Sequence, residues 1–181
     1  MSVDDGGVSS ALDVLERALS STSGKPVPRD LLHAALRSTA EALRSGHDRE
    51  TLKTVTTRDR VVGALARFLP RALGTLVRRQ LGETMCVFVT VEGRALVPLL
   101  DVLVSTMTTA CKEAKASGAE NTKVNVLSCL EALLGKLGVL CSSRLGDFYA
   151  LSKACLKTSD DAAVRTAAVR IIVAIVRHGG S

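Results

Sequence analysis

The sequence predicts an all-α fold of about eight helices in antiparallel pairs, and three observations support this prediction. First, hydrophobic residues make up 46% of the 181 residues but aromatic residues only 2%, so the core must be built from aliphatic side chains. Second, the apolar residues recur at spacings of three and four, which is the period of a helix with one buried face. Third, the chain has four prolines and few aromatic residues, whereas an all-β sandwich needs more turn, aromatic and β-branched residues.

Residues 10–45 are predicted to form the first helical pair. Leucines at helical spacing follow Ser10, and a small polar loop separates them from the second apolar run. Pro28 stands where a first-turn proline is favoured, because its missing N–H has no helical partner at that position. Gly46 comes directly after the second run and is typical of a helix end.

Residues 48–90 are predicted to form the second pair. An apolar face runs through Val61, Leu65 and Phe68, and Pro70 ends or kinks the helix because it lacks a donor and clashes one turn back. Residues 85–91 have the propensity of a β-strand, but a lone strand would leave its backbone groups unpaired. We therefore interpret this stretch as a buried helix or a short irregular connector.

Residues 94–142 and 145–178 are predicted to form the third and fourth pairs. Each pair carries apolar residues at helical spacing on both sides of a short turn. The four pairs have lengths that scatter around the ~40–47 residues of repeated helical hairpins. We expect residues 1–8 to be disordered and residues 9–181 to form a single helical repeat domain.

A sequence signature stands at the start of the last predicted helix. Asp161, Val164, Arg165 and Ala168 form the pattern D-x-x-V-R-x-x-A, which resembles the signature of HEAT repeats. The stretch that begins at Asn121 repeats this pattern only in part. The resemblance implies a HEAT/armadillo-like α-solenoid, clearest in residues 145–178, and a non-catalytic scaffold or adaptor that binds proteins. An irregular helical bundle is the alternative.

The last predicted helix is apolar on most sides. A repeat stack needs a polar outer face on its terminal helix, and this helix offers few polar residues. We expect this sequence to be the N-terminal part of a longer array, or the helix to contact a second subunit. The predicted inter-repeat or subunit contact is made by Arg165, Val169, Ile172, Val173 and Val176.

The basic excess suggests an acidic partner. The formal net charge is +6, and four arginines, Arg60, Arg67, Arg71 and Arg78, follow one another at spacings of seven, four and seven. On a straight helix these arginines would form one ridge about 27 Å long. Such a ridge could bind an acidic peptide, a phosphate group or an acidic cytoskeletal tail like that of tubulin. The alternative is an ordinary solvated helix face.

Several functions are disfavoured by the sequence. The common motifs of hydrolases, metalloproteases and nucleotide-binding enzymes do not occur, and the five cysteines and three histidines lack the spacing of zinc ligands, so we expect neither catalysis, nor a metal, nor a cofactor. Nucleic acid is an unlikely partner because stacking aromatics are scarce. The odd cysteine count among aliphatic residues indicates reduced thiols and an intracellular, cytoplasmic protein without a membrane span, with the nucleus or cytoskeleton as other locations.

Two functions therefore remain open from the sequence. The first is a non-catalytic protein-interaction scaffold, with self-association or a following repeat at the last helix. The second is a basic module that uses the arginine ridge to bind acidic cytoskeletal tails or phosphate.

Overall fold

The computed structural model of the chain describes residues 7–20, 27–46, 49–113 and 116–179. The described residues contain helices and no strand, so the all-α prediction is confirmed. The predicted disorder of residues 1–8 lies outside the described residues for positions 1–6, whereas Val8 already begins a helix. The elements are α1 (Val8–Leu19), α2 (Arg29–Ser45), α3 (Arg49–Leu52), α4 (Val55–Ala66), α5 (Gly74–Val91), η1 (Gly93–Ala95), α6 (Leu96–Lys112), α7 (Ala119–Leu137), η2 (Gly138–Arg144), α8 (Leu145–Thr158) and α9 (Ala162–Gly179).

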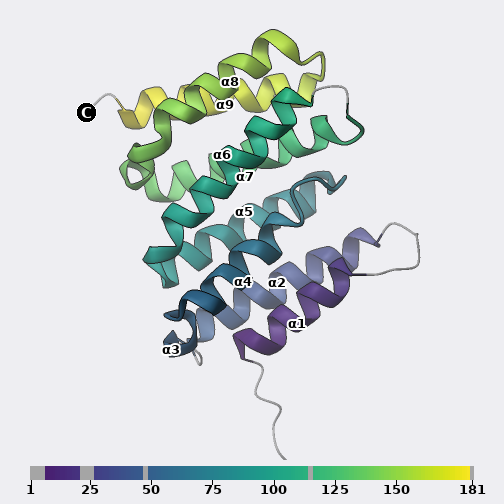
Figure 1. Cartoon of the computed structure of the whole chain (residues 1–181), viewed down its shortest axis with the longest axis vertical. Coiled ribbons are helices and arrows are strands. Elements are labelled where there is room, and N and C mark those ends of the chain that lie inside the picture. Colours follow the sequence, from purple (N-terminus) through teal and green to yellow (C-terminus); the bar gives the residue numbers. More distant parts are fainter. Residues whose placement is uncertain (1–6, 21–26, 47–48, 114–115, 180–181) are drawn as a thin grey trace, which may run out of the picture.

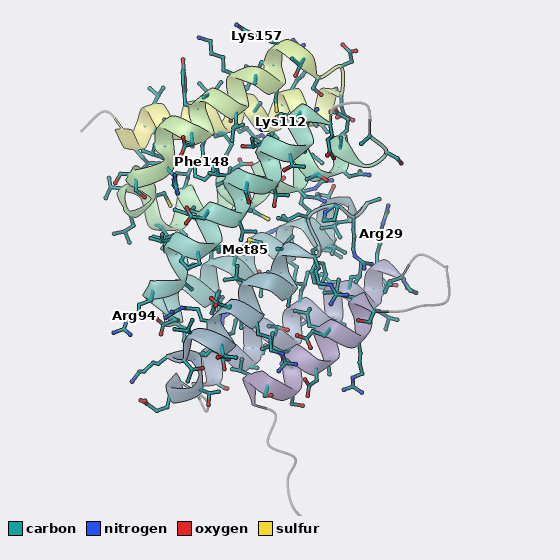
Figure 2. All side chains as sticks on the ribbon, viewed as in Figure 1. Arg29, Met85, Arg94, Lys112, Phe148 and Lys157 are labelled. Carbon is teal, nitrogen blue, oxygen red and sulfur yellow. The ribbon has the colours of Figure 1, made fainter. Side chains whose placement is uncertain are left out.

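The long helices stack in two layers (Figure 1). One layer contains α1, α4, α6 and α8, and the other contains α2, α5, α7 and α9, so that the chain alternates between the layers. Neighbours within a layer run parallel: Arg78 and Gly82 of α5 contact Asn125 and Ala132 of α7, in the same order along both helices. The large aliphatic and aromatic side chains, such as Met85 and Phe148 (Figure 2), are buried by this stacking.

At Pro70, where the sequence predicts that the helix ends or kinks, the helix has ended. Helix α4 ends at Ala66, a turn spans residues 67–73, and α5 begins at Gly74. Gly74 has a φ of 73°, and a Cβ there would lie 3.2 Å from the guanidinium of Arg29, so this turn requires glycine. Residues 85–91 belong to α5, which confirms that the strand-like stretch is a buried helix.

A buried amide on α7 fixes this turn. Asn125 is fully buried, and its Nδ2 donates to the carbonyl oxygens of Leu69 and Arg71 at 2.9 and 2.7 Å. Its Oδ1 accepts from Nε of Arg78 at 2.9 Å. Both polar atoms of this side chain make hydrogen bonds, so little free energy is lost by burying the amide. The amide thus joins the α4–α5 turn to the next helical pair.

The start of α9 forms as the sequence predicts. The Asp161 carboxylate accepts from the backbone N–H groups of Ala163 and Val164 at 2.8 and 3.0 Å, as a helix N-cap does. The Ser159 hydroxyl donates to the Glu120 carboxylate of α7 at 2.5 Å, which connects the α8–α9 turn to the preceding pair.

Two stretches, Gly93–Lys112 and Ala119–Thr158, are long and apolar enough to cross a membrane by length and composition. The second stretch is not one straight helix, since it contains α7, η2 and α8. Core helices of soluble proteins pass the same test, and part of each stretch is buried in the stack. The absence of a membrane span therefore stays a prediction.

Candidate functional site

The surface of the layer that contains α2, α5, α7 and α9 carries two adjoining hollows. The larger one has a volume of about 510 Å³ and is lined by Arg44, Glu83, Cys86, Val87, Thr90, Val91, Ala132, Gly135 and Lys136. The smaller one has a volume of about 350 Å³ and is lined by Thr75, Arg78, Arg79, Ser128, Glu131, Ala132 and Arg170. Because Ala132 lines both, we treat them as one feature, the α5–α7 groove.

The groove forms where two helices approach closely. A Cβ at Gly82 would lie 3.0 Å from the Cβ of Ala132, which is tighter than an ordinary van der Waals contact, so the glycine allows α5 and α7 to approach closely at this crossing. The floor beside it is apolar, with Val87 and Cys86 among its residues. Burial raises the pKa of the Cys86 thiol to about 11, so this side chain stays protonated and uncharged at neutral pH. The floor can therefore accept an apolar side chain.

The rim of the groove is basic. Arg44 pairs with Glu83 at 2.7 Å, and Arg170 lies 3.9 Å from Glu131. Arg78 is directed to the buried Asn125, and burial lowers the pKa of its guanidinium.

Two further cations on the rim are available to a ligand. Arg79 and Lys136 are exposed, and within the described part of the chain neither makes a hydrogen bond or salt bridge. The α5–α7 groove thus combines an apolar floor with two uncompensated positive charges. This combination can hold a segment that carries both apolar and acidic side chains.

The predicted arginine ridge does not exist as one line, because the chain leaves the helix between Ala66 and Gly74. Arg60 binds α1, with Nη2 at 2.5 Å from Asp13 and 2.7 Å from Glu16. The hydrogen bond from Arg60 lowers the pKa of Glu16. Arg60 is therefore an inter-helix contact rather than a free cation.

The next two arginines of the predicted ridge also face α1. Arg71 donates to the backbone carbonyl of Leu19 at 2.8 Å, where a cation suits the negative end of the helix. Arg67 is exposed and lies 3.4 Å from the hydroxyl of Ser20. We call Arg60, Arg67 and Arg71 the α1-facing arginine cluster. Of the four predicted residues only Arg78 lines the α5–α7 groove.

The predicted contact residues of the last helix lie on α9. Val169, Val173 and Val176 are 49%, 42% and 67% exposed, and Ile172 is partly buried. Arg165 is exposed and donates to the carbonyl of Leu156 at 3.1 Å, on the helix of its own pair, α8. A role of the valine stripe in binding a further repeat or subunit stays a prediction.

A third hollow of about 470 Å³ lies near the start of α7. Its lining consists of small, proline and hydroxyl-bearing residues, with Glu113 as its charged side chain. The described residues contain no group of three or more side chains that could hold a metal ion. The third hollow therefore offers no recognisable chemistry for a specific ligand.

Sequence reasoning missed the groove because its residues come from four helices, α2, α5, α7 and α9, that are far apart in the sequence. Arg79 stands beside the predicted ridge, and Lys136 follows a glycine in the last turn of the largely apolar helix α7. The sequence signal for this site was an isolated lysine on the polar side of such a helix. One sequence does not show, however, whether that lysine forms a salt bridge in the folded protein.

Comparisons of the chain with protein-family models, with curated proteins and with solved structures found no match.

Proposed function

We propose that this protein is a non-catalytic protein-interaction module that binds an acidic, amphipathic segment of a partner protein in the α5–α7 groove. The observation that carries the proposal is the pair of exposed, unpaired cations, Arg79 and Lys136, beside an apolar floor. We place the module in the HEAT/armadillo-like class.

The alternation of the chain between two layers supports this class. Helical hairpins that repeat in the same orientation are typical of α-solenoids, and their surfaces bind extended partner segments. The side-by-side parallel course of α5 and α7 and the D-x-x-V-R-x-x-A pattern at Asp161 agree with such a repeat.

The chemistry of the groove supports an acidic partner segment. An apolar side chain that enters the larger hollow gains roughly 1.5–3 kcal/mol from burial. Carboxylates that meet Arg79 or Lys136 at the exposed rim each add about 0.2–1 kcal/mol. Charge at the rim therefore sets specificity and association rate, while the floor supplies most of the affinity.

A peptide-display selection tests this proposal. The purified chain is the bait, and a variant with Arg79→Glu and Lys136→Glu is the counter-bait. We expect the selected peptides to combine acidic residues with at least one large apolar residue, and to bind the counter-bait at least about tenfold more weakly.

The matched control reverses two exposed lysines of the other layer, Lys112 on α6 and Lys157 on α8 (Figure 2). This variant has the same net charge as the counter-bait and should keep full binding. Equal weakening of both variants would mean that only net charge matters, and selection of neutral peptides would refute an acidic partner.

The alternative of a module for acidic cytoskeletal tails or phosphate that uses the arginine ridge has less support. Arg60 and Arg71 already bind groups of α1. Arg67 is the exposed member of the cluster, and Arg67→Glu in the same assay examines this alternative. The described free cysteines support a reducing, intracellular location, which we propose together with the function.

A further inference from the structure

Two cysteines from different helical pairs face each other. Cys111 lies in the last turn of α6 and Cys155 lies on α8, and their Sγ atoms are 3.8 Å apart. All five cysteines are free thiols. A disulfide has an S–S distance of about 2.05 Å, so closure requires the two sulfurs to approach by less than about 2 Å.

The two thiols differ in exposure. Cys155 is fully buried, whereas Cys111 is partly exposed to solvent. An oxidant can therefore reach Cys111 first, and Cys155 is protected from solvent but in contact with Cys111. This is the arrangement of an attacking thiol and a resolving thiol.

A buried charge stands near the pair. Lys123 of α7 is fully buried and pairs with Glu120 at 2.7 Å. A hydrogen bond with Cys155 lowers the pKa of Cys111; burial acts against this shift, the ammonium of Lys123 assists it and the carboxylate of Glu120 opposes it. The pKa of Cys155 is raised, first by the same hydrogen bond and then by burial. The first proton therefore leaves from Cys111.

We propose that Cys111 and Cys155 are a peroxide-reactive dithiol that closes to a disulfide between α6 and α8. The Cys111 thiolate attacks hydrogen peroxide, the O–O bond breaks, and the products are a sulfenic acid and hydroxide, which takes up the released proton to give water. The Cys155 thiol then attacks the sulfenic sulfur, and its proton leaves with the hydroxyl as a second water. Both sulfurs are oxidised by one electron each, and the peroxide is reduced to two waters.

The disulfide would join the third and fourth helical pairs covalently. Neither cysteine lines the α5–α7 groove, so this modification site is independent of the proposed binding function. It gives the stack a covalent connection that a reducing environment removes.

Peptide mapping tests the proposal on the whole chain. The folded protein is treated with a small excess of hydrogen peroxide, remaining thiols are blocked, and the protein is digested with trypsin. Cys111 and Cys155 fall in the separate fragments 95–112 and 154–157. We expect a cross-linked product of these two fragments, reversed by dithiothreitol, to be the main oxidation product.

The other cysteines provide the controls. Cys86→Ser should leave the cross-link unchanged, because burial keeps the pKa of that thiol high. Cys155→Ser should stop the reaction at a Cys111 sulfenic acid, which dimedone captures. The result that would overturn the proposal is oxidation of wild-type protein without the 111–155 cross-link, or the same cross-link yield when the protein is oxidised in urea.

Discussion

The α1-facing arginine cluster and the α5–α7 groove are both basic, but they use their charge differently. In the cluster, Arg60 and Arg71 are held by carboxylates and a helix-end carbonyl of α1. In the groove, Arg79 and Lys136 have no partner among the described residues. A row of arginines in a sequence therefore does not identify a binding site, because the fold decides which cations are already neutralised.

The largest expected effect concerns the buried amide that joins the two regions. Asn125→Ala removes the donor to the carbonyls of Leu69 and Arg71 and leaves both without that bond. We expect a loss of about 3 kcal/mol in the free energy of unfolding, measured by urea denaturation. Asn121→Ala, earlier on the same helix and without such bonds in the described structure, should cost less than about 1 kcal/mol. Similar losses in the two variants would show that Asn125 does not fix the turn.

The next effect concerns the floor of the groove. Gly82→Leu forces a side chain against Ala132, where even a Cβ would lie 3.0 Å away, so we expect a loss of about 2 kcal/mol in stability. Gly63→Leu is the matched control in the middle of α4, because a Cβ there meets nothing within 4 Å. The thermal unfolding of both variants is compared with that of the wild-type protein. If Gly82→Leu were as stable as the wild type, α5 and α7 would not approach closely at this position.

A smaller effect is expected in the arginine cluster. Arg60 and Glu16 have about a third of their side chains exposed (35% and 33%), so solvent screens their attraction. A double-mutant cycle with Arg60→Met and Glu16→Gln should give a coupling energy of about 0.5–1 kcal/mol. A coupling energy near zero would mean that the Arg60–Glu16 pair does not stabilise the contact between α4 and α1.

The same pair sets a pH dependence. Arg60 lowers the pKa of Glu16 in the folded state, so Glu16 contributes stability above its unfolded pKa of about 4.5. This contribution is lost as the pH falls through the lower folded pKa. The free energy of unfolding of the wild-type protein should therefore fall more than that of Glu16→Gln between pH 6 and about pH 3. An equal fall in both proteins would show that the Glu16 carboxylate does not contribute to stability in this way.

Much of the fold could be predicted from the sequence, because helical spacing and capping act locally. Pro28, Gly46 and Asp161 mark helix ends correctly. For the strand-like stretch 85–91 the absence of strand partners leaves a buried helix or a short irregular connector, and the structure shows the helix. The sequence predicts that the helix ends or kinks at Pro70, but it does not give the extent of the α4–α5 turn. Its position depends on the buried Asn125, which comes from a helix more than 50 residues later.

The candidate site could not be predicted in the same way. A groove depends on which helices become neighbours and on which charges find partners, and both are tertiary properties. Arg60 appears free in the sequence but is paired with residues 44 and 47 positions earlier. Lys136 appears unremarkable in the sequence but remains unpaired on the rim of the α5–α7 groove.

The most direct measurement compares single charge reversals in the two regions. A peptide obtained from the display selection is labelled, and its binding isotherms are recorded with wild-type protein, Lys136→Glu and Arg67→Glu. We predict that Lys136→Glu weakens binding about three- to tenfold, because it removes one exposed ion pair and adds a repulsion, while Arg67→Glu changes binding less than about twofold. Loss of binding in Arg67→Glu with full binding in Lys136→Glu would contradict the assignment of the site to the α5–α7 groove.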